Sequence, residues 1–501
     1  MAAGAEGPVD AVVVGAGPNG LAAAVTLARA GLSVRVYERD DHPGGGAATR
    51  ELTLPGFRHD VCSAVHPLAF ASPFFEAFGL RERVEFITPA VSFAQPLDAG
   101  RAAIAYRDLD ATAGALGRDG RAYARLMGPL ATRADRIAEF TGSSLLRVPR
   151  HPITALRFGL RALEQGSPLW NTRFREDAAP ALLTGVTSHS ILAQPSVAGA
   201  GAGLALAAYA HAEGWPLPVG GSQAIIDALV ADLVAHGGEV VTGHEVTSLA
   251  ELDNARVVLL DVTPRALVRL AGDRMPARYR RTLSRFRYGG GVAKVDFALS
   301  RPVPWTHREV RRAGTVHLGG TRAEMARAEN AVTKGHHPDS PYVLVSQPTL
   351  FDPTRAPEGA HTLWTYTHVP ADSPFDRAEA IIAQIERFAP GFRDTILAVS
   401  SRSAVEVAAH NPNYIGGDIA AGAPTLRQLV RRPTLSPDPW RTPIPGVYLS
   451  TASASPGPGV HGLAGWHAAL SALRHEFGVH EAPDLSPRTS ANGLSGGTAS
   501  S

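Results

Sequence analysis

Residues 10–49 read DAVVVGAGPNGLAAAVTLARAGLSVRVYERDDHPGGGAAT, and this stretch decides the fold of the chain. The apolar run at 11–14 predicts a strand, residues 18–30 predict a helix of small side chains, and residues 33–37 predict a second strand. In the intervening GAGPNG, the first glycine permits a tight turn, the second lets a pyrophosphate approach the backbone, and the third lets the helix pack on the sheet. The helix N-terminus offers unpaired N–H groups to an anion. The stretch therefore predicts a βαβ dinucleotide-binding unit.

An acidic residue, Glu38, ends the second predicted strand and follows Gly15 by 23 residues. A carboxylate at this place can accept hydrogen bonds from both hydroxyls of an adenosine ribose, and it would repel a 2′-phosphate. A surface glutamate beside an ordinary glycine-rich turn is the plainer alternative. The strand before the turn, the helix after it and the spacing of the acid together favour the dinucleotide interpretation.

Composition excludes several classes of function. The chain has 501 residues, 45% of them hydrophobic, which is enough for the core of two or three domains. The net charge of +2 points to neither nucleic acid nor an acidic partner. Cys62 is the single cysteine, which excludes an intrachain disulfide and a paired-cysteine redox centre. The first nine residues lack the pattern of a signal peptide and no run of about 18 strongly apolar residues occurs, so we expect a cytoplasmic protein.

Residues just beyond Glu38 carry a resemblance to a known family. Gly44, Gly45 and Thr49 stand at the places of the extended fingerprint of FAD-binding flavoproteins of the glutathione-reductase-like superfamily. Within it, the pattern resembles the phytoene desaturase and amine oxidase branch, which usually has Arg or Lys at the position of Gly46. The resemblance implies that FAD is held by Gly15, Gly17, Pro18, Asn19, Gly20, Glu38, Arg39, Gly44, Gly45 and Gly46.

A second glycine-rich stretch, residues 442–469, reads TPIPGVYLSTASASPGPGVHGLAGWHAA and is similar to the C-terminal FAD motif of phytoene-desaturase-like oxidoreductases. The resemblance places the Ala452 backbone against the pyrophosphate. It places Gly459 and the N–H groups of Val460 and His461, at a helix start, against the flavin ring, where such donors stabilise negative charge on reduced flavin. It also implies a contact of Val246 on the adenine side.

Catalytic residues are not assigned by these motifs. The resemblance gives three candidates for the pocket beside the flavin, which are His66, His461 and Trp466. No metal site is expected. Lys294, on the predicted strand 291–299, is interpreted as a solvated or structural residue.

The predicted fold class is α/β with an α+β substrate domain. A Rossmann-type FAD-binding domain is expected to be interleaved with a substrate-binding domain. The first comprises residues 8–70, 215–270 and 425–478, the second comprises residues 71–214 and 271–424, and residues 1–7 and 479–501 are expected to be disordered tails. Helices are predicted at 118–140, 153–165 and 195–212, and a strand at 245–249. The small side chains of the helix predicted at 195–212 are compatible with burial in the core, with a place in the wall of a substrate tunnel, or with contact with a membrane.

The resemblance implies an FAD-dependent dehydrogenase or desaturase that takes hydride from an apolar substrate, for which an isoprenoid or polyene is one option, and passes electrons to an external acceptor. Residues 413–445 look nearest to the group that includes pyridine nucleotide-disulfide oxidoreductase domain-containing protein 2. An amine or amino-acid oxidase, a flavin-bound regulatory protein with little turnover and an isomerase are the alternatives. We expect no nucleic-acid partner, and peripheral membrane contact and oligomeric state stay open.

Overall fold

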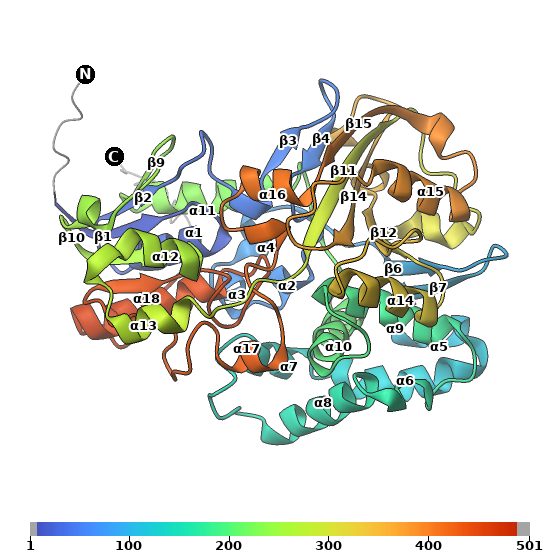
Figure 1. Ribbon diagram of the computed structural model, residues 1–501, viewed down its shortest axis with the longest axis horizontal. Helices are drawn as coiled ribbons and strands as arrows, with labels where there is room; N and C mark the ends of the chain where they lie inside the picture. The colour runs from blue at the N-terminus through green and yellow to red at the C-terminus, as the bar shows by residue number, and fades with distance from the viewer. Residues whose placement is uncertain (1–7, 488–501) are drawn as a thin grey trace, which may run out of the picture.

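The computed structural model describes residues 8–487. Its first layer is a five-stranded parallel sheet in the order β16-β10-β1-β2-β9, at the left of Figure 1. The strands are β1 (Val9–Val14), β2 (Val34–Tyr37), β9 (Glu239–Val241), β10 (Ala255–Leu260) and β16 (Val447–Leu449). Segments from the start, the middle and the end of the chain thus meet in one Rossmann-type sheet, which gives the protein its α/β class.

Helices cover both faces of this sheet because its strands alternate their side chains between two cores. Ala11 and Val13 of β1 belong to one core, whereas Val12 and Val14 belong to the other. The helices α1 (Pro18–Arg29), α11 (Gln223–Ala235) and α18 (Leu463–Phe477) contribute to the first core, and α12 (Pro264–Ala271) and α13 (Ala277–Leu283) contribute to the second. The alanines of α1 are buried, so small side chains bring this helix close to its neighbours.

The second layer is a seven-stranded mixed sheet in the order β15-β11-β14-β13-β12-β6-β7. Its strands are β6 (Val91–Pro96), β7 (Ala102–Tyr106), β11 (Gly291–Leu299), β12 (Ala313–Leu318), β13 (Val343–Ser346), β14 (His361–Val369) and β15 (Ile396–Arg402). Every residue of β11 is buried, including Lys294, whose side chain pairs with Asp296 two residues along the same face. The lysine is therefore not solvated. Helices α14 (Arg322–Thr333) and α15 (Ala378–Phe388) pack at this sheet.

A helical lobe lies below the second sheet in Figure 1. It consists of α5 (Leu109–Ala115), α6 (Gly120–Ala131), α7 (Ala134–Thr141), α8 (Pro152–Gln165), α9 (Ala178–Thr187) and α10 (Val197–Ala212). The helix predicted at 118–140 is broken, because Arg133 leaves helical geometry between α6 and α7. Helix α10 is central, and a Cβ at Gly203 would lie 2.4 Å from Thr187 of α9, so its glycine permits close packing.

Short elements connect these layers. They are β3 (Thr49–Glu51), β4 (Arg58–Asp60), α2 (Pro67–Phe70), α3 (Pro73–Ala77), α4 (Leu80–Arg83), β5 (Phe86–Ile87), β8 (Leu217–Pro218), α16 (Ala404–His410) and α17 (Leu426–Val430). Phe74 and Phe78, which fall in the stretch assigned to the substrate domain, pack into the core of the five-stranded sheet. No strand forms at 245–249, because that segment runs as a coil into a 3₁₀ turn.

Two further expectations concern the chain ends and membranes. The tails expected at 1–7 and 488–501 lie outside the described residues. Residues 479–487 were expected to be disordered as well, but Leu485 is buried in the first core and its carbonyl accepts a hydrogen bond from Arg83. Within residues 8–487, no helix has the length and apolar character needed to cross a membrane.

Candidate functional site

One continuous cavity of about 870 Å³ runs from the glycine-rich turn after β1 to the helical lobe. Most residues that the sequence assigned to the cofactor line it. They are Gly15, Gly17, Pro18, Asn19, Glu38, Arg39, Gly45, Gly46, Val246, Ala452, Gly459, Val460 and His461. Gly20 and Gly44 lie behind this wall. A Cβ at Gly20 would lie 1.9 Å from the Gly15 carbonyl oxygen, and the Gly44 N–H donates to the Ala16 carbonyl, so both glycines shape the turn.

The start of α1 is prepared for an anion. Gly17 is the N-cap residue and supplies no side-chain cap, Pro18 has no N–H, and the Gly20 N–H donates to Asp261, so the Asn19 N–H is the donor of the first turn that has no partner among the described residues. A Cβ at Gly17 would approach Asp261 Oδ2 at 3.2 Å. The Asn19 side chain is buried and lines the cavity beside this turn. These features fit the pyrophosphate of a dinucleotide.

Glu38 lies at the end of β2 and faces the cavity. Its carboxylate accepts hydrogen bonds from the N–H groups of Ala16, at 2.7 Å, and Asp40, at 3.0 Å. The backbone therefore holds the carboxylate beside the glycine-rich turn. A side chain fixed in this way can receive ribose hydroxyls without first being ordered.

Asp261 is a cavity residue that sequence reasoning missed. It directly follows β10, and its Oδ2 accepts a hydrogen bond from the Gly20 N–H at 3.2 Å. Burial raises the pKa of Asp261 to about 7, and the charge of Glu38 acts in the same direction. Near neutral pH the carboxyl is therefore partly protonated beside the expected pyrophosphate. An acid directly after a buried strand, at the carboxyl edge of a parallel sheet, is the signal that could have found it.

The C-terminal loop forms the opposite wall and is fixed by a buried arginine. Arg432 is fully buried and donates two hydrogen bonds to the Ala452 carbonyl, at 3.0 and 2.8 Å. It also donates to the carbonyls of Ala420 and Gly422. The Arg432 guanidinium thus holds the Ala452 backbone where the sequence resemblance puts the pyrophosphate.

Val460 and His461 expose backbone donors in the same loop. Neither N–H donates a hydrogen bond to another residue within 8–487. Helix α18 begins at Leu463, so these two groups precede the helix start rather than form it. Gly459 has φ +139°, and a Cβ there would lie 2.4 Å from Leu68. The loop geometry therefore depends on glycine at this position.

The three pocket candidates have different surroundings. His66 lines the cavity, and its Nε2 shares a 2.7 Å hydrogen bond with the Ser222 hydroxyl. His461 also lines the cavity, but its Nδ1 accepts from the Leu463 N–H and its Nε2 lies 3.2 Å from the Gly457 carbonyl, so both nitrogens are engaged. Burial lowers the pKa of each histidine to about 4. The structure does not bring Trp466 to the cavity, and its ring packs against Phe74.

Gly46, where the resembled family usually has a basic residue, is explained by its neighbour. A Cβ at Gly46 would lie 2.4 Å from the Tyr414 hydroxyl. Tyr414 and Cys62 both line the cavity, and burial raises the pKa of the Cys62 thiol. The tyrosine ring therefore occupies the space that a longer side chain at position 46 would need.

The far end of the cavity is mostly apolar, and α10, for which a tunnel wall was one of the interpretations left open by the sequence, lines it. Its walls come from the helical lobe and the second sheet. They include Phe140, Phe158, Ala162, Leu163, Ala198, Gly201, Ala205, Leu206, Tyr209, Trp215, Leu344, Trp364 and Tyr366. The ring of His189 also lies in this wall, and its Nε2 is 2.8 Å from that of the fully buried His317. Burial lowers the pKa of His189 to about 3, so the imidazole is neutral at neutral pH.

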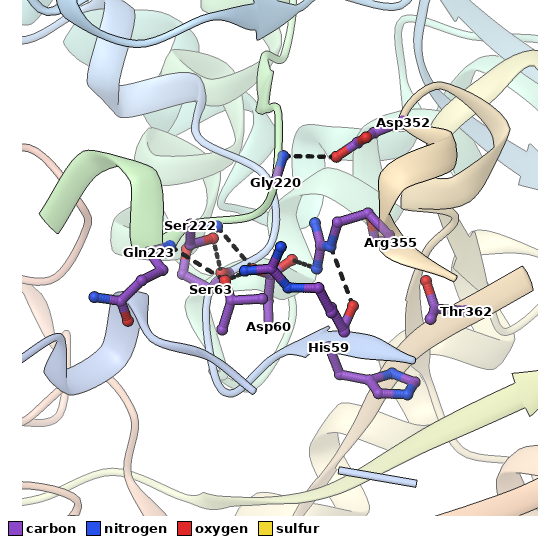
Figure 2. Close-up of polar contacts among 12 residues, drawn as sticks. His59, Asp60, Ser63, Gly220, Ser222, Gln223, Asp352, Arg355 and Thr362 are labelled. Atoms are coloured by element: carbon purple, nitrogen blue, oxygen red, sulfur yellow. Dashed lines mark hydrogen bonds and ion pairs between the residues drawn. The ribbon is translucent and has the colours of Figure 1, made fainter. Parts of the chain in front are cut away.

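A buried polar cluster around Asp60, Arg355 and Ser222 joins the two layers (Figure 2). Asp60 of β4 pairs with Arg355 at 2.8 Å and accepts a hydrogen bond from the Ser222 N–H at 2.9 Å. Arg355 also donates to the Arg58 carbonyl. The cluster fixes Ser222, which holds His66 at the cavity wall.

The described residues do not form a metal-binding cluster. Among residues 8–487, no group of three or more His, Cys, Asp or Glu side chains is arranged to hold a metal ion.

The sheet topology, the glycine-rich turn and Glu38 define a Rossmann-type dinucleotide-binding protein. A family model described as an NAD(P)-binding Rossmann-like domain matches residues 13–78. A putrescine oxidase structure shares the fold, with a TM-score of 0.56, 18% identity and coverage of 93% of this chain and 98% of that one.

Two relatives extend the similarity along the sequence. The chain is 30% identical over 433 residues to a phytoene dehydrogenase of Streptomyces griseus, covering 79% of each protein. It is 25% identical over 570 aligned residues to the pyridine nucleotide-disulfide oxidoreductase domain-containing protein 2 of Rattus norvegicus, covering 93% of each. The chain belongs to the phytoene dehydrogenase family of oxidoreductases.

Proposed function

We propose that the protein is an FAD-dependent dehydrogenase that oxidises a C–H bond of an apolar substrate and passes the electrons to an external acceptor. One observation carries this proposal, which is that a single cavity joins the dinucleotide cradle to an apolar chamber. A cofactor bound along the cradle would meet a substrate bound in the chamber, with no protein wall between them.

The cradle fits FAD at three separate places. The start of α1 suits the pyrophosphate, Glu38 suits the ribose hydroxyls, and the free N–H groups of Val460 and His461 suit a carbonyl edge of the flavin ring. Bound flavin supplies the hydride-accepting chemistry, and the protein supplies binding, orientation and electrostatics. Donors fixed before the reaction stabilise developing negative charge without reorganisation.

The chamber side favours an uncharged substrate. The carboxylates that line the cavity are Glu38, Asp40, Glu245 and Asp261, and all four come from segments at the dinucleotide end. No carboxylate among the described lining residues lies in the apolar chamber to pair with a substrate ammonium. Burying an unpaired charge is costly, so the chamber selects apolar molecules.

The neutral histidines can orient a substrate without adding charge to the cavity, and a histidine that accepts a proton becomes positively charged. His66 is held by Ser222, and His189 is held by His317, whereas the nitrogens of His461 are engaged within its own loop. His66 and His189 are therefore groups of this chain able to receive a proton from a substrate beside the cofactor.

Amine oxidation is the second candidate because two aromatic rings lie together in the chamber wall. Trp364 and Tyr366 of β14 have ring centroids 5.2 Å apart at an interplanar angle of 80°. Such rings can attract an ammonium group through their π faces. The side chain of Lys294, however, already lies 5.6 Å from the Trp364 ring centroid, which places a positive charge near the same ring.

An anaerobic titration tests the two candidates against each other. The purified yellow protein is mixed under argon with fractions of a lipid extract or with a panel of amines, and the flavin absorbance is followed. We expect bleaching by one or more apolar fractions and none by the amines. Bleaching by amines alone would establish the second candidate instead. If the bound chromophore proves not to be a flavin, both candidates fail.

A further inference from the structure

Helix α8 carries an exposed apolar stripe. Ile153, Leu156, Leu160 and Leu163 are 66%, 64%, 56% and 53% exposed, and their spacing places them on one side of the helix. The opposite side, which includes Thr154 and Phe158, is buried against the lobe. A stripe of four large aliphatic side chains on a helix of about 21 Å is far more than scattered surface residues provide.

The same surface continues on both sides of α8. The loop before the helix exposes Leu145, Leu146 and Val148, the last at 89%, and Leu426 of α17 is also exposed. In Figure 1, α7, α8 and α17 lie along one edge of the molecule. We call the whole set the α8 face. It consists of Leu145, Leu146, Val148, Ile153, Leu156, Leu160, Leu163 and Leu426.

The α8 face surrounds one end of the cavity. Leu145, Leu163 and Leu426 belong both to the exposed face and to the cavity lining. Phe158 and Ala162, on the buried side of α8, line the apolar chamber behind them. An apolar molecule at this face would therefore reach the chamber along a continuous apolar path.

The charge of the face is one-sided. Residues 143–163 contain four arginines and no acidic residue, and residues 424–435 likewise contain arginines and no acid. Two of these arginines are paired with acids just outside the first range, Arg150 with Glu139 and Arg161 with Glu164. Within the part of the chain that the structure describes, Arg157, Arg427 and Arg431 form no ion pair. Exposed leucines framed by unpaired arginines match the interface of a bilayer with anionic headgroups.

We propose that the α8 face docks on an anionic lipid bilayer, with α8 lying in the plane of the interface and the cavity end facing the acyl chains. Docking depends on the surface alone. The consequence that the substrate enters from the bilayer rests on the proposed function. A second copy of the chain is a poorer occupant, because pairing two such faces would bring their unpaired arginines together.

Vesicle flotation of the full-length protein as purified tests the proposal. The protein is floated with phosphatidylcholine vesicles and with vesicles that also contain phosphatidylglycerol. We expect binding to the anionic vesicles that weakens as salt is raised. Leu156→Glu with Leu160→Glu should weaken binding by about tenfold or more, because two inserted side chains become charged. Arg157→Gln and Arg427→Gln should each weaken it by about fivefold.

Val234→Glu is the matched control. Val234 is 57% exposed on α11, away from the α8 face, so this variant should bind vesicles like the parent. Equal binding by the Leu156→Glu, Leu160→Glu protein and the control would overturn the proposal, as would the absence of binding to anionic vesicles. Light scattering that shows a dimer dissolved by the leucine substitutions would overturn it too and would assign the face to a second copy. Flotation needs no turnover, so its failure is distinct from a failure of the flavin titration.

Discussion

Asp60 and Arg355 form an ion pair, with 2.8 Å between Oδ2 and Nη2, and each side chain is 1% exposed. The pair joins β4, beside the cofactor turn, to the segment before β14 of the second sheet. Burial by itself would raise the pKa of Asp60, but the charge and hydrogen bonds of Arg355 and its other donors outweigh this effect and lower the pKa. Asp60 also accepts a hydrogen bond from the Ser222 N–H, and the Ser222 hydroxyl in turn is hydrogen-bonded to His66. The ion pair that connects the two layers therefore also determines the position of His66.

Breaking this pair should destabilise the protein strongly. Arg355→Met leaves the Asp60 charge buried without its partner, which typically costs about 3–5 kcal/mol. Urea unfolding measures the loss, and the double variant Arg355→Met with Asp60→Asn should recover part of it. Arg393→Gln, which breaks an exposed pair with Glu379, is the control and should change little. Equal effects of Arg355→Met and the control would contradict the role given to the pair.

Glu38→Gln should release the cofactor. The variant loses the charge that strengthens hydrogen bonds from ribose hydroxyls, each worth about 1.5–3 kcal/mol. FAD should then separate from the protein on desalting far more readily than from the parent. Asp41→Asn, an exposed neighbour, serves as the control. Unchanged flavin affinity in Glu38→Gln would show that the ribose lies elsewhere.

Asp261 should make stability depend on pH in a recognisable way. Its pKa is about 7 in the folded chain, against the ordinary 3.8, because the carboxyl is buried. The contribution of Asp261 to the free energy of unfolding is fully present below about pH 4. It decreases by roughly 4 kcal/mol as the pH rises from about 4 to about 7. Asp261→Asn keeps an acceptor for the Gly20 N–H and removes the titration. Urea unfolding of both proteins across this range should therefore give diverging curves, and parallel curves would refute the assignment.

Gly459→Val should make the flavin harder to reduce. The added side chain meets Leu68 at a backbone conformation that disfavours side chains, so the loop must move and weaken the donors at Val460 and His461. Losing one charge-assisted hydrogen bond to reduced flavin would lower the two-electron midpoint potential by roughly 30–60 mV. Gly478→Val, also at positive φ but in open space at the end of α18, is the control. A potential unchanged in both variants, with flavin still bound, would separate this loop from the ring.

The residues of the site that lie within the glycine-rich motif could be predicted from the sequence. The turn around Gly15 and Gly17 and the position of Glu38 follow from local geometry, since strand, turn and helix are contiguous. Side-chain direction was harder to predict. Trp466 stands in the expected motif, yet the rotation of α18 turns its ring toward Phe74 and away from the cavity.

Contacts between distant segments were beyond sequence reasoning. His189 and His317 are 128 residues apart, and only the packing of the helical lobe on the second sheet brings their rings together. Gly46 is unusual for its family because Tyr414, far along the chain, fills the adjacent space. The helical pattern of 153–165 predicted α8, but tertiary packing decides that its leucines remain exposed.

The central claim is that the dinucleotide cradle and the apolar chamber form one reaction cavity. Anaerobic flavin reduction by an active apolar fraction, compared between the parent protein and Gly201→Phe, tests this claim most directly. Gly201 lines the chamber, and a Cβ there meets nothing closer than 3.8 Å, so phenylalanine would fill the space without displacing the backbone. Gly114→Phe, in open space on α5, is the control. The account predicts rapid bleaching of the parent and control, and a yellow Gly201→Phe protein that dithionite still reduces. Equal bleaching of all three by the apolar fraction would contradict it.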